Sequence, residues 1–524
     1  MLRHNTLSIL LLLLLVPRIY AQEADEPVDG QGMERLLHGV RYNVEVQGSL
    51  SNGQTPLWLN ANKYGLSSLD EKNGYARAAI QRPLSADTTR RWGLGYGLDV
   101  AVPVNYTSDV VVQQAYAEAR WLKGVLTVGS KNRPMEWKNN ALSSGSQTLG
   151  INARPVPQVR LALQDYWVPG FLNGWLRLKG HVAYGKMTDD NWQHEFTSRQ
   201  SKYADNVLYH SKACYIKIGN EERFFPLSLE LGVEMGAFYG GTSYTRDAST
   251  GEMTGMECQG GLKGAWQVLI PAGKDPEENV YRNIAGDELG SWLVRINYDT
   301  ELWSLHLYGD KFFEDHSGLF FIDYDGFGEG EEWQKYKKFR ILLYDLKDVM
   351  LGTELNLHYG TWLRNVVFEY LYTKYQSGPI YHDHTYYISD HVAGQDNFYN
   401  HYIYPGWQHW GQVIGNPLYR SPIYNTDGTI EVQNNRFLAF HLGFDGQPTK
   451  RLGYRVLATW QKGYGTYATP YTKPRENISF LTECTYRLPK GWTVRGAYAM
   501  DFGRILGDNH GFQLTISKSG WLSH

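Results

Sequence analysis

The stretch GWTVRGAYAMDFG, residues 491–503, shows the pattern that decides the fold, because its side chains alternate between two faces. Large apolar side chains fall on one face (Trp492, Val494, Tyr498, Met500 and Phe502), and small or polar ones on the other (Thr493, Arg495, Ala497, Ala499 and Asp501). About a dozen segments repeat this period of two, which is typical of β-strands. In lipid such strands must close on themselves, because hydrocarbon tolerates no unpaired backbone N–H or C=O group. We therefore predict an all-β, transmembrane, antiparallel up-and-down β-barrel.

The composition agrees with a barrel and argues against a helical membrane protein. The chain has 524 residues, of which 14% are aromatic and 55 are glycine, and its mean hydropathy is −0.45. Barrels alternate apolar and polar side chains, so that their average composition looks soluble. The same composition also suits a soluble all-β glycan-binding protein. A net charge of −3 provides no basic surface for nucleic acid, so we expect no nucleic-acid partner.

The spacing of amphipathic segments predicts about 18 strands, with long extracellular loops and short periplasmic turns. Strands in one direction are expected at residues 39–50, 91–104, 124–130, 175–187, 227–239, 302–313, 362–374, 451–463 and 492–503. Strands in the other direction are expected at residues 73–82, 110–121, 157–165, 208–218, 289–298, 348–358, 435–444, 478–487 and 510–518. Turns at one end are short, as at residues 122–124 and 488–491, whereas most connections at the other end are long. Glu230 and Glu234 are expected to face a polar interior.

The N-terminus reads as a secretion signal. Arg3 precedes a short apolar run at residues 7–16, and Ala21 provides a small residue before Gln22. The run is too short to span a bilayer. We predict a signal peptide at residues 1–21, a short periplasmic segment at 22–38 and the barrel at 39–524. The last amphipathic segment, residues 509–516, resembles the terminal strand that barrel-insertion machinery recognises, although the chain continues to His524.

Few residues point to covalent or metal chemistry. Cys214, Cys258 and Cys484 are too few for a disulfide framework, so isolated thiols are favoured over a Cys214–Cys258 bridge. The sequence contains no GxSxG nucleophile motif, and the neighbouring Asp189 and Asp190 would point to opposite faces of a strand. We predict no enzyme activity and no cofactor.

The segment of residues 381–411 is rich in histidine, aspartate and aromatic side chains. His382, Asp383 and His384 form only a weak metal motif, so no metal site is predicted. Aromatic rings stack on sugar faces and amides bond sugar hydroxyls, so the segment suits a glycan. The alternative is that its tyrosines and tryptophans pack the long loop into a plug or lid.

Five stretches resemble the Wzi-type capsule assembly family of Gram-negative bacteria. They are PLWLNANKYGLSS (56–68), GSKNRPMEW (129–137), LSSGSQTLGINARPVPQVRL (142–161), KGHVAYGKMTDDNWQ (179–193) and GQDNFYNHYIYPGW with GQVIGNPL (394–407 and 411–418). The resemblance implies an 18-stranded outer-membrane barrel that acts as a lectin and helps to hold capsular or exopolysaccharide at the cell surface. Some family members carry an N-terminal helical bundle, for which residues 23–39 leave little room.

The leading hypothesis is a multi-pass barrel in the outer-membrane lipid that binds capsular or exopolysaccharide. The alternatives are a porin or transporter channel and, third, an outer-membrane hydrolase. Glycan-binding candidates come from three long loops expected at one rim: Arg133, Asn152, Arg154, Asp189, Asn191, Trp192, Gln395, Asn397, Tyr399, Asn400 and Trp407. The arginines would suit the carboxylates of an acidic polysaccharide. Equally, these residues could tie the loops to one another.

We expect signal peptidase to cut between Ala21 and Gln22, because Ala21 is the small residue that follows the apolar run and Pro17. N-terminal sequencing of the protein from cell envelopes should therefore begin at Gln22. A mature chain that begins before residue 17 would contradict secretion by a cleaved signal.

Overall fold

The computed structural model describes residues 37–87, 91–170, 173–220, 225–247, 249–270, 286–314, 321–324, 326–342, 347–381, 384–387 and 392–522. The predicted signal peptide with Ala21 and Gln22, and nearly all of the segment 22–38, lie outside the described residues and stay predictions. His382 and Asp383 lie outside them as well.

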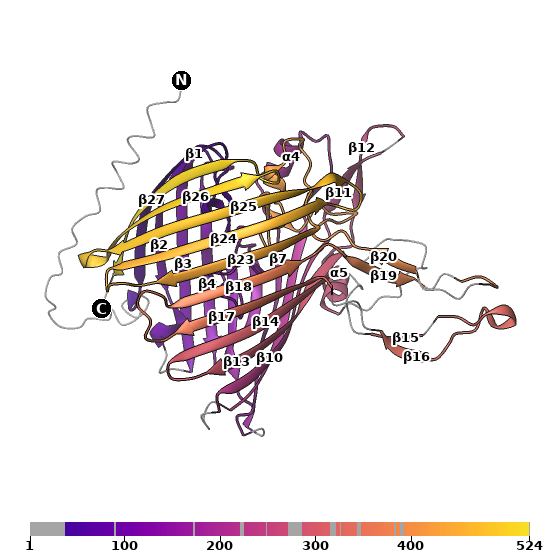
Figure 1. Ribbon diagram of the computed structural model, residues 1–524, viewed down its shortest axis with the longest axis horizontal. Coiled ribbons are helices and arrows are strands. Elements are labelled where there is room, and N and C mark those ends of the chain that lie inside the picture. The colour runs from indigo at the N-terminus through magenta and orange to yellow at the C-terminus, as the bar shows by residue number, and fades with distance from the viewer. Residues whose placement is uncertain are drawn as a thin grey trace.

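One antiparallel sheet of 18 strands closes into a barrel (Figure 1). Its strands are β1 (Arg41–Asn52), β2 (Lys72–Arg82), β3 (Trp92–Val104), β4 (Val111–Trp121), β5 (Gly124–Ser130), β6 (Gln158–Trp167), β7 (Leu176–Lys186), β9 (Leu208–Ile218), β10 (Leu227–Tyr239), β13 (Asp287–Asp299), β14 (Trp303–Glu314), β17 (Val349–Leu357), β18 (Asn365–Tyr372), β23 (Phe437–Gly446), β24 (Leu452–Gly465), β25 (Pro470–Arg487), β26 (Trp492–Gly503) and β27 (Asn509–Trp521). The seam is the pairing of β1 with β27, which runs from Arg41 opposite Trp521 to Asn52 opposite His510. The predicted fold class and strand number are confirmed.

The remaining elements belong to the connections. Short strands pair as β8 (Tyr203–Asp205) with β11 (Thr242–Arg246) and β12 (Met253–Glu257), β15 (Phe321–Tyr324) with β16 (Phe339–Leu342), β19 (Ser377–Tyr381) with β20 (Val392–Gln395), and β21 (Gln408–His409) with β22 (Gln412–Val413). The helices are α3 (Leu57–Asn60), α4 (Trp192–Thr197) and α5 (Gly261–Leu269), with 3₁₀ turns at Leu84–Asp87, Gly330–Glu332, Pro422–Tyr424 and Pro489–Gly491. The pairs β15–β16 and β19–β20 project beyond the barrel end (Figure 1). No helix among the described residues is long and apolar enough to cross a membrane.

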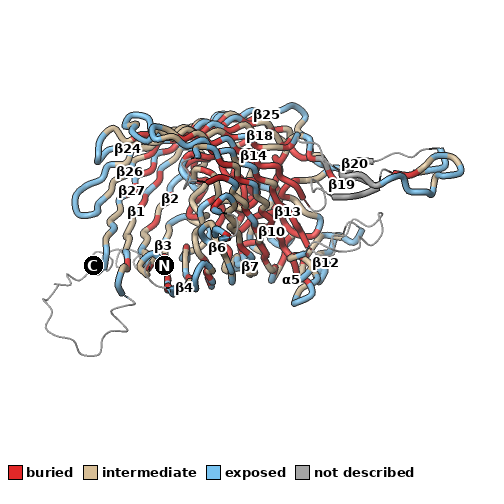
Figure 2. The backbone as a smooth tube through the Cα atoms, turned by 90° about the horizontal axis from the view of Figure 1, so that it is seen from below, coloured by how far each residue is buried: buried red, intermediate tan, exposed pale blue. Residues whose placement is uncertain are grey.

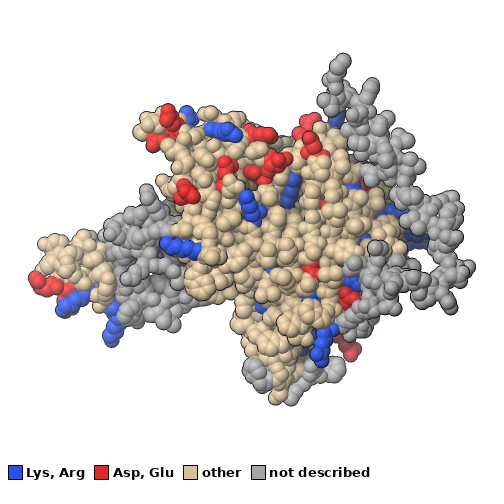
Figure 3. Space-filling model, turned by 180° about the vertical axis from the view of Figure 1, so that it is seen from behind, with Lys and Arg blue, Asp and Glu red and all other residues tan. Residues whose placement is uncertain are grey.

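The two faces of the strands differ as the alternation predicts. On β26, Tyr498 and Phe502 are exposed on the outer wall, whereas Ala497 and Ala499 are buried inside. Several inward charges find partners across the sheet, as Arg455 does with Glu483 at 3.1 Å. Figure 3 shows that the middle of the wall carries few charged side chains on the side in view. A closed barrel with an exposed apolar belt satisfies its backbone within lipid, so the protein is a β-barrel of the outer membrane.

The largest difference between expected and observed strands is at β25. The sequence predicts a start at residue 478, whereas the strand begins at Pro470. Residues from Thr472 to Glu476 are exposed, so this part carries no alternation of apolar and polar faces. The period of two marks only strand segments that have lipid on one side and a filled lumen on the other, and it ends where β25 leaves that environment.

The three cysteines are free thiols, and Cys214 and Cys484 are exposed. The interpretation as isolated thiols is confirmed, and the alternative Cys214–Cys258 bridge is absent from the structure.

Which residues of β24 face lipid can be tested by placing an arginine at two different depths in the membrane. Val456 faces outward near mid-strand, and we expect Val456→Arg to lower the free energy of unfolding by about 2–4 kcal/mol, because a guanidinium would enter hydrocarbon. Leu452 lies on the same face beside the short turn, and Leu452→Arg should cost about 0–1 kcal/mol. Urea unfolding of both variants in lipid vesicles measures the difference. Equal costs would show that Val456 does not face lipid.

Candidate functional site

Three connections fold back into the barrel and form a plug, which we define as residues 53–71, 131–157 and 396–435. Many of their side chains are buried, including Leu142, Tyr399, Trp407 and Tyr419. They share one apolar cluster with inward residues of the strands, such as Phe312. Figure 2 shows the buried segments gathered in the half of the barrel nearer the long loops, whereas the opposite end is mostly intermediate or exposed. The plug therefore fills the extracellular half of the lumen.

Trp407 lies at the centre of the plug. Its side chain is 0% exposed, and its ring lies 4.6 Å from that of Phe238 on β10. The indole Nε1 donates to the carbonyl of Thr148 at 3.1 Å, which joins two of the plug segments. A Cβ at Gly236 would lie 2.5 Å from the indole, so only glycine lets the ring approach the wall this closely.

The plug is fastened to the inner wall by buried carboxylates. Glu369 on β18 accepts hydrogen bonds from the Ser143 hydroxyl at 2.5 Å and from the Ser144 backbone N–H at 2.7 Å. The Tyr308 hydroxyl donates to the same carboxylate at 2.6 Å. Lys138 forms an ion pair with Asp310 on β14. Buried carboxylates need such partners because an unpaired charge in a low-dielectric interior is costly. These contacts bind residues 131–157 to one side of the barrel.

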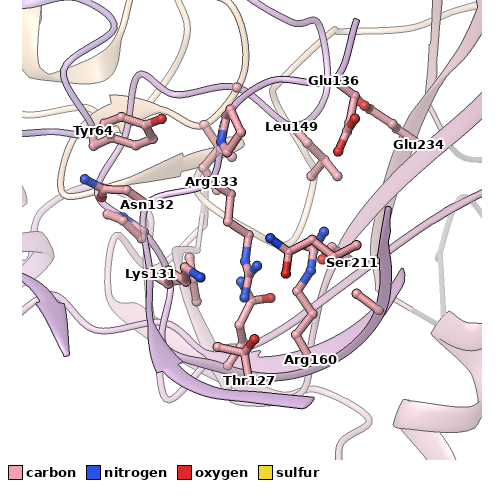
Figure 4. Close-up of a pocket in the computed structure, with 18 of the residues that line it drawn as sticks. Tyr64, Thr127, Lys131, Asn132, Arg133, Glu136, Leu149, Arg160, Ser211 and Glu234 are labelled. Atoms are coloured by element: carbon pink, nitrogen blue, oxygen red, sulfur yellow. The ribbon is translucent and has the colours of Figure 1, made fainter. Parts of the chain in front are cut away.

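A cavity of about 370 Å³ lies beside the plug, between residues 131–157 and the inner faces of β5 and β6 (Figure 4). Its lining runs from plug residues such as Asn132 and Arg154 down the wall to Thr127 and Gln164. The cavity therefore extends from the plug into the periplasmic half of the lumen. Lining residues that can donate hydrogen bonds include Tyr64, Lys131, Asn132, Arg133, Gln158, Arg160, Lys179, Ser211 and Tyr215.

The charges around the cavity are unequally paired. Lys131 bonds Glu118 at 2.6 Å, and Lys179 bonds Glu136 at 2.7 Å. Arg133 and Arg160 form no ion pair with a described carboxylate, and Nε and Nη2 of Arg133 and Nε of Arg160 are buried without a hydrogen-bond partner among the described residues. Burial lowers the pKa of Arg133, but a guanidinium remains charged at neutral pH.

Two buried guanidiniums that form no ion pair with a described carboxylate are unfavourable in a low-dielectric interior. A bound carboxylate or phosphate would remove this cost and can take two parallel hydrogen bonds from each guanidinium. In Figure 4, Arg133 comes from the loop and Arg160 from the strand below it. The cavity is therefore chemically suited to an anion.

Of the eleven candidates from the sequence, Arg133 and Arg154 line this cavity. Arg154 donates to the hydroxyls of Thr107 at 3.2 Å and Ser108 at 2.9 Å, and its guanidinium lies 4.0 Å from the ring centre of Trp410. Burial lowers its pKa to about 10, so it too is charged at neutral pH. The expected arginine pair lies at the cavity, but Arg154 is held by other loops.

Five candidates lie in the plug. Asn152, Tyr399 and Trp407 each bond a residue of another plug segment, whereas Asn397 and Asn400 bond residues of their own segment, 396–435. Asn152 donates to the carbonyl of Val413 at 3.0 Å, and Tyr399 stacks on Tyr419 with ring centres 4.0 Å apart. Asn397 and Asn400 bond each other at 3.0 Å, and Trp407 bonds Thr148 as described. The alternative interpretation, that the candidates tie the loops to one another, accounts for the contacts of Asn152, Tyr399 and Trp407. Their part in glycan binding stays a prediction.

The other four candidates do not line the cavity. Trp192 in α4 is buried and stacks on Phe196 with ring centres 4.8 Å apart. Asp189 accepts a hydrogen bond from the Gln193 backbone, and Asn191 precedes α4 with φ of 63°. Gln395 is exposed at the end of β20. The eleven residues do not all line one cavity: Trp192 packs against Gly411 of the plug, whereas Gln395 belongs to β20, which projects beyond the barrel end (Figure 1).

Sequence reasoning missed Arg160, Lys179 and Tyr215. Each lies on a barrel strand, where a polar residue at an inward position is common and attracts no attention. One sequence signal could have identified Arg160: it lies at an inward position of β6, the strand that directly follows the loop carrying Arg133. Among the described residues no group of three side chains could hold a metal ion. His384, the described residue of the weak metal motif, stacks on Phe327 with ring centres 3.5 Å apart.

Removing the central ring should loosen the plug without opening the barrel. We expect Trp407→Ala to cost about 3–5 kcal/mol of local packing, because it leaves a large void between two plug segments and β10. We expect the plugged, unaltered protein to pass little ion current across planar bilayers and the variant to pass several-fold more. The matched control is Trp362→Ala in an exposed turn, which should leave the current unchanged. Identical currents in all three proteins would show that residue 407 does not hold the plug.

Comparisons with known proteins support the fold. No family model matches the sequence, and no curated protein matches it. Among solved structures, Wzi of Escherichia coli, described as a carbohydrate-binding β-barrel involved in group 1 capsule assembly, has a TM-score of 0.55 and 13% identity over 94% of this chain and 87% of its own. Two Pseudomonas aeruginosa outer-membrane proteins are also similar: OccK3 (TM-score 0.43, 13% identity, 95% and 100% covered) and OprD (0.42, 10%, 93% and 96%). At 13% identity the likeness to Wzi shows that the chain shares the fold of an outer-membrane barrel.

Proposed function

We propose that the protein is a non-enzymatic, lectin-like barrel that binds an acidic capsular polysaccharide or exopolysaccharide and helps to assemble it and attach it to the cell surface. One observation carries the proposal: Arg133 and Arg160 line the cavity with buried guanidinium nitrogens that have no partner among the described residues. Carboxylates of uronic acids are the common anionic groups of such polymers, and they match the geometry of a guanidinium.

The rest of the cavity suits a sugar that carries this carboxylate. Asn132, Gln158 and Ser211 can exchange hydrogen bonds with ring hydroxyls. A volume of about 370 Å³ lies at the lower end of the range for small-ligand sites, which corresponds to a short segment of a polymer. The ligand would enter the barrel interior and contact the inner wall, where the two arginines lie.

Binding is a better match than hydrolysis for the carboxylates at the cavity. Of the three carboxylates that line the cavity, Glu136 is paired with Lys179 and Glu234 accepts the hydroxyl of Tyr215 at 2.6 Å, so that only Asp165 remains. A glycosidase needs one carboxylic acid and one free carboxylate on either side of the bond that breaks. The description of Wzi as a carbohydrate-binding barrel supports the same proposal, as a distant relative in fold.

A porin function is less well supported because the plug occupies the extracellular half of the lumen. A channel would need a continuous polar path, whereas Trp407, Tyr399 and Tyr419 form a closed aromatic cluster there. The conductance measurement above separates the two functions. A high current in the unaltered protein would favour the channel.

The arginines can be tested by binding of defined oligosaccharides. We expect oligoglucuronate to bind the purified barrel and its neutral, carboxyl-reduced form to bind at least about tenfold more weakly, since each charged hydrogen bond contributes roughly 1.5–3 kcal/mol. The double variant Arg133→Gln/Arg160→Gln should lose the preference for the acidic form. Isothermal titration calorimetry measures both affinities.

The matched control is Arg475→Gln, which removes an exposed guanidinium of β25 beside Tyr471 and should leave binding unchanged. Heat-modifiable migration on gels confirms that each variant is folded. Equal affinity for acidic and neutral oligosaccharides, or unchanged binding by the folded double variant, would refute the proposed site. Cells that express the double variant should release polysaccharide into the medium.

A further inference from the structure

Helix α5 lies against the outside of the barrel, at the rim that carries the long loops (Figure 1). Val268 is fully buried and packs with Ala237 and Tyr239, which are outward residues at the end of β10. Gly264 lies over Tyr239, where a Cβ would come within 3.1 Å of the ring. The helix is therefore packed closely on the outer wall, where the lipid-facing side of β10 ends.

The wall beneath α5 is unusually polar for the outside of a membrane barrel. Lys212 on β9 donates from Nζ to the carbonyls of Val268 at 2.6 Å and Leu269 at 2.9 Å, which are at the C-terminal end of the helix. The Tyr184 hydroxyl donates to the carbonyl of Ala265 at 2.9 Å. Cations at a helix C-terminus are stabilising. In hydrocarbon the same lysine would be costly, so α5 shields a polar patch from lipid.

The opposite side of α5 is an apolar ridge, which we define as Leu262, Trp266 and Ile270. The three residues are spaced by four positions and are 91%, 62% and 45% exposed. Leu262 and Trp266 lie one above the other on the helix because they are four residues apart, and Ile270 directly follows the last helical residue. Lys263 is exposed beside the ridge. Further down the same wall, Val182, Leu231 and Val294 are exposed outward residues of the apolar belt. The ridge thus continues the lipid-facing surface of the barrel upward.

We propose that α5 is an interfacial membrane helix, whose apolar ridge enters the outer leaflet of the outer membrane while Lys263 meets the anionic headgroups. Trp266 then lies at the boundary between headgroups and acyl chains, where tryptophan is enriched in membrane proteins. This interaction surface is separate from the glycan cavity, which lies inside the barrel. Its partner is a lipid surface.

The size of the ridge favours lipid over a protein partner. Even aromatic side chains bury only roughly 150–250 Å² each, so a ridge of one tryptophan, one leucine and one isoleucine offers less than the ~800 Å² per partner of a standard protein interface. A lipid leaflet needs no such minimum, because it surrounds the whole barrel and already contacts the adjacent belt.

The proposal can be tested with an environment-sensitive nitrobenzoxadiazole label on a single cysteine. The background carries Cys214→Ser, Cys258→Ser and Cys484→Ser, and the label is placed by Leu262→Cys. The matched control is Ser249→Cys, an exposed position in the turn between β11 and β12. Both proteins are reconstituted into phosphatidylethanolamine–phosphatidylglycerol vesicles that contain a nitroxide on the acyl chain, and folding is checked by heat-modifiable migration.

We expect the label at position 262 to emit at shorter wavelength than the control and to be quenched by the acyl-chain nitroxide at least about threefold more strongly. Aqueous iodide should quench the control and spare position 262. Iodide quenching of position 262 equal to that of the control would overturn the proposal, since the ridge would then lie in water. Shielding of position 262 from both quenchers would also overturn it, because the ridge would then be covered by protein.

Discussion

The whole structure depends on the pairing of every backbone N–H and C=O group within the sheet. Hydrocarbon provides no hydrogen-bond partner, so the first strand must find the last, and β1 pairs with β27 along its full length. Closure then divides every strand into a face for lipid and a face for the lumen. The lumen of 18 strands is too wide for the strand side chains alone to fill, and this space is what the loops occupy.

Filling the lumen with loops places loop backbone in the interior, and the contacts of the plug with the inner wall stabilise it there. Loop backbone in the interior must be hydrogen-bonded, and the inner wall supplies partners at fixed positions: Glu369 for residues 143 and 144, and His441 for the carbonyl of Leu142 at 2.7 Å. Between these contacts apolar packing dominates, around Trp407. Where Arg133 and Arg160 line the cavity, buried nitrogens of both guanidiniums lack a hydrogen-bond partner among the described residues. Single buried nitrogens of Arg295 and Arg455 lack one as well, so it is the cavity beside Arg133 and Arg160 that makes this pair the basis of the proposed function.

The sequence was most informative where a strand has lipid on one side. The bounds of β9 and β10 agree with the pattern at residues 208–218 and 227–239, because each strand alternates between two contrasting environments. The extended start of β25 was missed because its residues are exposed on both faces. For the loops, composition identified aromatic and amide side chains but not their direction. Trp407 and Gln395 come from the same long connection, yet one is enclosed and the other exposed, and only the long-range contacts of the plug decide between them. Arg160 could not be singled out for a similar reason, since its importance depends on Arg133 from a different segment.

The plug also joins parts of the chain that are distant in sequence, and this restricts the order of assembly. Trp58 donates to the hydroxyl of Thr459, Lys63 contacts Gln513 on the last strand, and Asn60 contacts Tyr424. The first two contacts cannot form before β24 and β27 have been made, and the third needs residues that directly precede β23. Their loop-closure entropy is large, and such non-local contacts slow folding. The plug is therefore completed only when β1 and β27 are about to pair. Closure of the sheet and packing of the plug are then late events of one cooperative step.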